Sequence, residues 1–267
     1  FYGEQRVGDA GFRSHVGVRS FDIGRAMLQH DFTLAIDLIM TGRSPEVYCP
    51  RAEEMNAREV WKTSSGDARA TLKAFPKNRN TMVRERDLMK GLLRYGDALE
   101  AIRCVPHNVR MYWIHSYQSY IWNRVATERV RRWGLRPVIG DLFIREHDSE
   151  SDEQDGAAVV VQVVDDPDSI NISQIVLPLP GYNVQYPLND MGELYTKMLH
   201  DDGIQLVKNN KVPESTAKGS YRKLLQRASQ LKWDIVSRKE GDHQLDPSDS
   251  RFVSDARLTF ELRSGCY

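Results

Sequence analysis

The charged residues of this chain are sorted along the sequence into three blocks, although its 37 basic and 37 acidic residues cancel. Residues 1–137 carry 23 Lys and Arg against 15 Asp and Glu, a net charge of +8. Residues 138–215 carry 4 against 15, a net of −11, and residues 216–267 carry 10 against 7, a net of +3. This asymmetry predicts a polyanionic partner for the two basic segments, with ordinary solvated surface as the alternative.

Hydrophobic periodicity predicts that the first half of the chain is helical, because apolar residues recur there every three or four positions. The longest helix is expected from Asn108 to Gly134, about 40 Å at 1.5 Å per residue. Four apolar residues should form its core-facing stripe: Ile114, Tyr117, Ile121 and Val125. Shorter helices are expected from Ser20, after the N-cap Asp31 with Leu34, Leu38 and Ile39 inward, over 67–75 and over 83–95, whereas 41–66 is predicted to be irregular.

β-Branched residues predict strands in the second half of the chain. The expected strands are 137–144, 157–164, 174–179, 231–236 and 257–262, and one helix is expected over 189–200. The last strand alternates cleanly between polar and apolar residues, which predicts that it is half-buried. The acidic stretch 146–155 is typical of a disordered loop. Together these elements predict an α+β fold, in which the acidic, strand-rich segment 137–215 is inserted into a basic host.

Composition excludes several classes of protein. No apolar run approaches the roughly 18–20 residues of a membrane helix, and no signal peptide is visible. Three widely spaced cysteines, Cys49, Cys104 and Cys266, favour a reducing, intracellular compartment, either nucleus or cytoplasm. The seven histidines lack H-x-x-x-H spacing, and neither a P-loop nor a G-x-G-x-x-G motif occurs. Neither a metal nor a cofactor is therefore expected.

Four sequence blocks resemble a known family. The first is Phe1-Tyr2-Gly3-Glu4-Gln5-Arg6-Val7-Gly8, followed by Ile23-Gly24-Arg25-Ala26-Met27-Leu28. The others are His115-Ser116-Tyr117-Gln118-Ser119-Tyr120-Ile121-Trp122-Asn123, then Val176-Leu177-Pro178-Leu179-Pro180-Gly181-Tyr182-Asn183-Val184-Gln185-Tyr186-Pro187, then Gly219-Ser220-Tyr221-Arg222-Lys223. In this order and spacing they resemble the eukaryotic branch of the TruD-type pseudouridine synthases, with Val7 in place of the family's usual Phe.

The resemblance implies a fold, a reaction and a partner. The implied fold is a catalytic domain, placed here at 1–136 and 216–267, with an inserted TruD-type domain at 137–215. The implied reaction isomerises uridine to pseudouridine in RNA, first of all in tRNA, with snRNA and mRNA as further candidates. In such enzymes an aspartate carboxylate drives cleavage of the base–sugar bond, and C5 of the turned uracil rejoins the ribose. The enzyme is expected to be a monomer that needs no cofactor or metal.

The family's catalytic aspartate has no counterpart in this sequence. It belongs to a G-x-K-D-x-x-A block upstream of the first block, and the chain contains no Lys-Asp dipeptide. We therefore name no nucleophile in the chain. The chain is expected to be a C-terminal part of a longer protein, because the first block lacks its leading Asn and the family continues beyond Tyr267. Alone, this part is expected to be inactive.

Candidate site residues follow from the matched blocks. The rings of Tyr2 and Tyr267 are expected to lie against an extruded base, and Gly3 would allow close approach of the backbone. The residues expected to contact RNA are Gln5, Arg6, Arg13, Arg19, Arg129, Arg131, Arg132, Tyr221 and Arg222. For the arginines near the end of the long helix, compensation of the helix dipole is the alternative. Packing and polar bracing are expected of a structural motif on that helix, formed by His115, Tyr117, Gln118, Trp122 and Asn123.

Two other functions are open at this point. A non-catalytic RNA-binding module, such as a degenerate paralogue, would carry the same basic segments, and a helical protein-interaction domain could carry basic surface for other reasons. A G-x-K-D block in the upstream coding sequence would distinguish the enzyme from the binding module. Salt-dependent RNA binding would distinguish both from a protein-interaction domain, because phosphate contacts release counterions.

Overall fold

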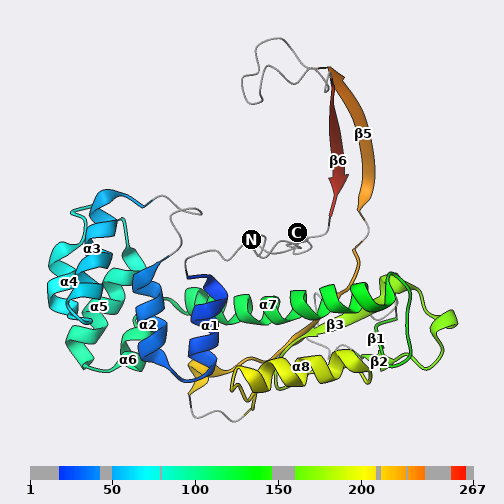
Figure 1. Cartoon of the computed structure of the whole chain (residues 1–267), viewed down its shortest axis with the longest axis horizontal. Helices are drawn as coiled ribbons and strands as arrows, with labels where there is room; N and C mark the ends of the chain where they lie inside the picture. The colour runs from blue at the N-terminus through cyan, green and yellow to red at the C-terminus, as the bar shows by residue number, and fades with distance from the viewer. Residues whose placement is uncertain are drawn as a thin grey trace. The chain divides into compact units, whose positions relative to one another are not determined.

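The computed structural model describes residues 18–42, 50–78, 80–145, 160–208, 212–226, 228–237 and 254–262 (Figure 1). Two compact units can be distinguished, of which one ends at Leu224 and the other begins at Leu225. The described part of the first unit contains helices and a four-stranded sheet, and that of the second contains a two-stranded hairpin. The predicted α+β fold class is therefore confirmed.

Within the described residues, six helices precede the long helix, and their ends follow the local signals in the sequence. They are α1 (Ser20–Leu28), α2 (Phe32–Thr41), α3 (Ala52–Thr63), α4 (Ala68–Ala74), α5 (Val83–Tyr95) and α6 (Ala98–Arg103). The Asp31 carboxylate accepts a hydrogen bond from the Leu34 amide at 2.9 Å and so caps α2. Asp67 and Asp97 cap α4 and α6 in the same way. Gly96 ends α5 in the left-handed region, at φ 65°.

Two predictions about these helices are wrong. The segment 41–66, predicted to be irregular, contains the 12-residue helix α3. The buried face of α3 consists of Glu54, Ala57 and Trp61, so a charged residue interrupts the apolar pattern that would have indicated a helix. On α2, Leu34 was expected to face the core but is 41% exposed. The core face of α2 lies instead on the side of Ala35 and Ile39.

The long helix α7 (His107–Trp133) organises the first unit. Its predicted apolar stripe is confirmed, since all four side chains are fully buried: Ile114, Tyr117, Ile121 and Val125. The helix ends at Gly134, which has φ 62°. Helix α1 crosses α7 at backbone contact, because a Cβ atom on Gly24 would lie 2.0 Å from the carbonyl oxygen of Trp113. Only glycine allows the two helices to approach this closely.

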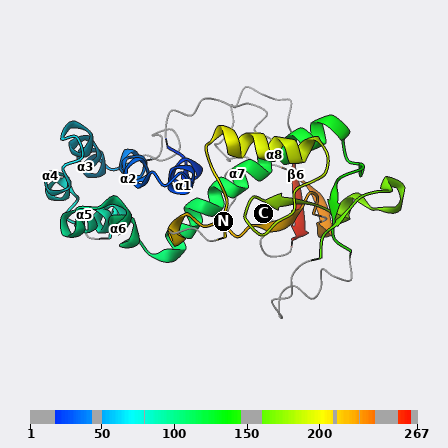
Figure 2. The same ribbon diagram turned by 90° about the horizontal axis from the view of Figure 1, so that it is seen from below.

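The sheet lies beside α7 and has the order β2-β1-β3-β4, with antiparallel neighbours. Its strands are β1 (Leu142–Phe143), β2 (Gln162–Val163), β3 (Ile175–Leu179) and β4 (Ser220–Lys223), with 3-10 turns at Pro167–Ser169, Ile172–Gln174 and Pro213–Ser215. The first two strands are shorter than predicted. Helix α8 (Asp190–Asp201), capped by Asn189 as the sequence predicts, runs alongside α7 and β3 (Figures 1 and 2). Within the described residues, no helix is long and apolar enough to cross a bilayer.

Contacts between elements cross both predicted domain boundaries, at 136 and at 215. Helix α7 contacts β3 and α8, and β4, which follows residue 215, pairs with β3. The described residues of 137–215 therefore share a compact unit with the long helix. The division of the chain into a catalytic domain and an insertion at these positions stays a prediction about the family. The acidic stretch 146–155 lies outside the described residues.

The second unit is an amphipathic hairpin of β5 (Ser229–Ser237) and β6 (Ser254–Glu261). Trp233 pairs with Leu258, and Ile235 pairs with Ala256. All described side chains of both strands are exposed, including Trp233 at 67% and Leu258 at 63%. The alternation correctly predicted a strand. That the apolar face of 257–262 is covered stays a prediction.

Candidate functional site

The expected base pocket lies outside the described residues. This holds for Tyr2, Gly3 and Tyr267, and equally for three of the predicted RNA contacts, Gln5, Arg6 and Arg13. All six assignments stay predictions. Three of the four sequence blocks lie within the first unit, and their described residues meet around strand β3.

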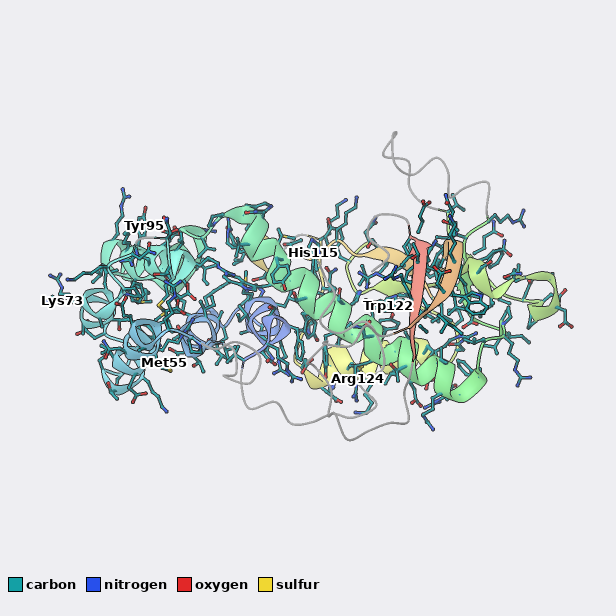
Figure 3. The ribbon with its side chains drawn as sticks, turned by 90° about the horizontal axis from the view of Figure 1, so that it is seen from above. Met55, Lys73, Tyr95, His115, Trp122 and Arg124 are labelled. Carbon is teal, nitrogen blue, oxygen red and sulfur yellow. The ribbon has the colours of Figure 1, made fainter. Side chains whose placement is uncertain are left out.

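The block on α7 holds the block on β3 through side-chain hydrogen bonds. The Gln118 amide, which is buried, donates to the carbonyl oxygen of Pro180 at 2.7 Å. The Trp122 indole donates to the carbonyl oxygen of Leu177 at 3.1 Å. His115 Nδ1 lies 2.7 Å from Gln118 Oε1 and so fixes the orientation of that amide. His115 and Trp122 lie about two turns apart along α7 (Figure 3). These contacts engage both polar atoms of the Gln118 side chain, as a structural motif would require.

The block on β4 joins the same assembly from the other side of β3. The Tyr221 hydroxyl accepts a hydrogen bond from the backbone amide of Gln185 at 2.6 Å. Arg222 lies opposite Leu177 in the pairing of β4 with β3. The Arg222 guanidinium lies 5.2 Å from the ring centroid of Trp122, within cation–π range. A Cβ atom on Gly181 would lie 2.2 Å from the Gly219 nitrogen, so the two blocks touch backbone to backbone. Tyr221 and Arg222 are half-buried, and their contact with RNA stays a prediction.

Asp202, just after α8, links three helices, and the sequence patterns did not single it out. Its carboxylate accepts a hydrogen bond from the Tyr117 hydroxyl at 2.8 Å and pairs with Arg25 of α1 at 3.4 Å. Burial, reinforced by the hydrogen bond to Asp202, raises the pKa of Tyr117 well above its usual range. Tyr117 therefore stays a neutral donor that braces α7 against the end of α8.

Arg129 was predicted to contact RNA, and the structure corrects this assignment. Its side chain is completely buried and pairs with the equally buried Asp141 at 2.7 Å. It also donates to the carbonyl oxygens of Gly134 and Arg136. A guanidinium enclosed in this way has no surface to offer a phosphate. The arginine instead satisfies the carbonyl group of the C-cap residue Gly134, which a helix leaves without an internal partner, and that of Arg136 just beyond the helix.

Its neighbours Arg131 and Arg132 are exposed but are engaged in ion pairs with Glu128, at 2.8 Å and 2.5 Å. Arg132 also pairs with Asp190 at 2.6 Å. The two arginines lower the pKa of Glu128 to about 2. Because both can exchange partners in water, their contact with RNA stays a prediction.

Arg19 completes a layered stack on α1 and α7. Its guanidinium lies 4.2 Å from the centroid of Phe21, whose ring stacks on Tyr120 at 4.1 Å with an interplanar angle of 14°. Arg19 is half-buried at the start of α1, next to the first sequence block. Its predicted contact with RNA stays a prediction. Among the described residues, no His, Cys, Asp or Glu side chains gather in a group that could hold a metal ion.

Comparisons with known proteins agree with this arrangement of blocks. The model of the family tRNA pseudouridine synthase D (TruD) matches residues 1–267. Pseudouridylate synthase 7 homolog of Mus musculus is 33% identical over 240 residues, covering 89% of this chain and 33% of that protein. Pseudouridylate synthase PUS7L of Homo sapiens is 31% identical over 281 residues, covering 100% and 37%. The chain therefore spans about a third of the length of the curated relatives that it matches.

A solved structure shows the same likeness in three dimensions. The chain superposes on a crystal structure from Methanosarcina mazei, assigned to tRNA pseudouridine synthase D (TruD), with a TM-score of 0.71 and 26% sequence identity. The superposition covers 98% of this chain and 58% of that one. With the family model matched from the first residue to the last, the chain belongs to the TruD family.

Proposed function

We propose that this chain is part of an RNA pseudouridine synthase, which isomerises uridine to pseudouridine in tRNA and in other RNAs. The observation that carries the proposal is the match of the family model to all 267 residues. A relative from Schizosaccharomyces pombe, 30% identical over 293 residues, is named Multisubstrate pseudouridine synthase 7. This name supports a substrate range wider than tRNA. The enzyme would work as a monomer, in the nucleus or the cytoplasm where its RNAs are found.

In the proposed reaction, this chain binds and positions the substrate while an aspartate outside it supplies the nucleophile. Attack of the carboxylate on C1′ of the ribose would break the bond between C1′ and N1. The freed uracil would turn, and its C5 would displace the carboxylate from C1′ as the new bond forms, while N1 takes up a proton. The proton from C5 would pass to solvent. The expected contribution of Tyr2 and Tyr267 is to stack on the extruded base, a contact worth roughly 1–3 kcal/mol per base. Neither bond change requires a metal or a redox cofactor.

The assembly around β3 supports the proposal that the chain provides a rigid frame for the first block. Residues 1–8 of the first block precede α1, and Ile23–Leu28 lie within it. Helix α1 contacts α7 at Gly24 and the end of α8 through the ion pair of Arg25 with Asp202. Site residues held on rigid elements keep their geometry better than residues on free loops. We therefore expect substitutions in the frame to lower turnover by moving the first block and not by removing a reacting group.

Release of tritium from tRNA labelled at C5 of uridine tests the proposal. The full-length protein should release tritium, and this chain alone should release no more than a blank without protein. Tyr2→Ala in the full-length protein should lower turnover far more than RNA affinity, because one stacked base is a small part of the contact area but is the reacting centre. Absence of turnover together with intact, salt-dependent binding would favour the non-catalytic RNA-binding module.

A further inference from the structure

Most of the net positive charge of the first 137 residues lies in one part of the fold. Residues 68–95, which contain α4 and α5, carry eight Lys and Arg against two acidic residues, a net charge of +6. The whole segment 1–137 has a net charge of +8. The polyanion that the sequence predicts as a partner should therefore be sought first at these two helices.

Among the described residues, five arginines elsewhere in that segment are paired with the acidic segment that follows it. Five ion pairs join the two: Arg25 with Asp202, Arg103 with Glu214, Arg110 with Glu214, Arg129 with Asp141, and Arg132 with Asp190. Two of these partners, Asp141 and Glu214, are buried or nearly so. These five arginines therefore have a carboxylate partner inside the fold and offer less charge to an external anion.

The region of α4 and α5 differs from the segment with these five arginines, because six of its cations face solvent without described carboxylate partners. Six exposed side chains form what we call the α4–α5 basic surface: Arg69, Lys73, Lys77, Arg84, Lys90 and Arg94. None of the six has an ion pair with a described residue. Lys73, labelled in Figure 3, points outward from the group of short helices. Lys90 and Arg94 lie one turn apart on α5, as Arg69 and Lys73 do on α4.

The acidic residues near this surface are already engaged or few. Glu85 is half-buried and pairs with Arg58 at 3.1 Å. The Asp67 carboxylate accepts hydrogen bonds from the amides of Arg69 and Ala70 at the start of α4. Asp87 is the one remaining carboxylate of residues 68–95, and it is half-buried. An approaching polyanion would therefore meet few free carboxylates on α4 and α5 themselves.

We propose that the α4–α5 basic surface binds phosphates of the RNA substrate, at a distance along the RNA from the uridine that reacts. This inference rests on the proposed function and adds to it a second contact region, separate from the assembly around β3. Unpaired cations gain most from phosphate contact, because no internal ion pair has to be broken. Tyr95, which is 47% exposed with Arg94 over its ring at 5.1 Å, offers an aromatic plane beside this surface for an unstacked base.

The test uses the full-length protein and a tRNA transcript, with dissociation constants measured across a range of salt concentrations. Two double variants remove charge from the surface, Lys73→Ala with Lys77→Ala and Lys90→Ala with Arg94→Ala. The matched control, Arg51→Ala with Lys62→Ala, removes two exposed cations of α3 and its N-cap. For each phosphate that a variant no longer binds, the slope of log affinity against log salt should fall by about 0.7–0.9. Circular dichroism checks that all variants remain helical.

Both surface variants should show reduced salt slopes and a reduced kcat/KM, whereas the α3 control should match the parent protein. Equal slopes in surface and control variants would overturn the inference, even if the enzyme turns over normally. Lack of turnover in the parent protein would instead overturn the proposed function and leave the binding comparison standing. Vesicles of phosphatidylserine and phosphatidylcholine form the last arm. Equally charge-dependent binding to vesicles, with no binding to tRNA, would mean that the surface recognises membrane and not RNA.

Discussion

The C-terminal half of α7 and the pair α4–α5 are both rich in basic residues, but they differ in whether these residues have carboxylate partners. On α7, Arg129 is buried against Asp141, and Arg131 and Arg132 are paired with Glu128. On α4 and α5, six cations face solvent with no described carboxylate as a partner. The difference teaches that the placement of the acidic residues, more than the number of basic ones, decides where a polyanion can bind.

The largest effect, a loss of folding stability, is expected from breaking the most deeply buried ion pair. Arg129→Ala would leave Asp141 charged and buried without its partner, which typically costs about 3–5 kcal/mol. The urea midpoint of the first unit should fall accordingly, measured by circular dichroism at constant pH. Arg131→Ala, on the exposed side of the same helix, is the control and should leave the midpoint unchanged. A midpoint equal in both variants would mean that α7 pairs its arginines without stabilising the fold.

A smaller loss is expected where a neutral side chain does the bracing. Tyr117→Phe removes the hydrogen bond to Asp202, and a bond of this kind contributes about 1–2 kcal/mol to the free energy of unfolding. Tyr95→Phe is the matched control, since that side chain is 47% exposed and lies beside the α4–α5 basic surface. The same urea titration compares them. A smaller loss for Tyr117→Phe than for Tyr95→Phe would contradict the bracing role of Asp202.

The bracing by Tyr117 should also give stability a dependence on alkaline pH. Burial raises the pKa of Tyr117 in the folded protein, whereas the unfolded phenol ionises near pH 10. Its contribution is therefore fully present below about pH 10 and is lost as the pH rises further, because the folded state keeps the proton. Unfolding measured between pH 8 and 11 should show a shallower decline for Tyr117→Phe than for the parent chain. An identical decline would assign the alkaline effect to other groups.

The smallest effect, a change in the salt dependence of tRNA binding, is expected when a carboxylate partner of the α7 arginines is removed. Glu128→Gln removes the carboxylate that pairs with Arg131 and Arg132, while Arg132 keeps its ion pair with Asp190. If the released Arg131 meets a phosphate, the salt slope of tRNA binding should steepen by about 0.7–0.9. The pKa of Glu128, lowered to about 2 by the two arginines, means that its carboxylate is ionised at every pH used for binding assays. Glu59→Gln on α3 serves as the control. An unchanged slope would show that α7 lies away from the RNA whether or not its arginines are paired.

The sequence predicted the elements whose local signals are strong. The stripe of α7, the caps at Asp31 and Asn189 and the end of α5 at Gly96 all depend on residues within a few positions of each other, and the structure contains them. Helix α3 was missed because Glu54 occupies a core-facing position, where periodicity requires an apolar residue.

The candidate site was predictable only in part, for a different reason. The motif on α7 named the residues that make contacts but not their partners, since Leu177, Pro180 and Asp202 lie 55, 62 and 85 positions further along the chain. Such pairs depend on the tertiary fold, which local periodicity does not contain. The pairing of Arg129 with Asp141, only 12 positions away, was missed because a basic helix end already had an explanation in the helix dipole.

Residues around 202 and 215 contact α1 and the residue after it, near the start of the chain, and this has a consequence for the synthesis of the protein. The buried Ser215 hydroxyl donates to the carbonyl oxygen of Met27 across 188 positions of sequence, and Gln29 reaches the carbonyl oxygen of Asp202 across 173. At translation rates of about 5–20 residues per second, α1 would leave the ribosome roughly 10–40 s before the segment that closes over it. During that interval its apolar face has to be shielded by α2, α7 or a chaperone. Such distant contacts also make for slow folding, so premature termination just after α7 should yield an aggregation-prone polypeptide and not a smaller stable domain.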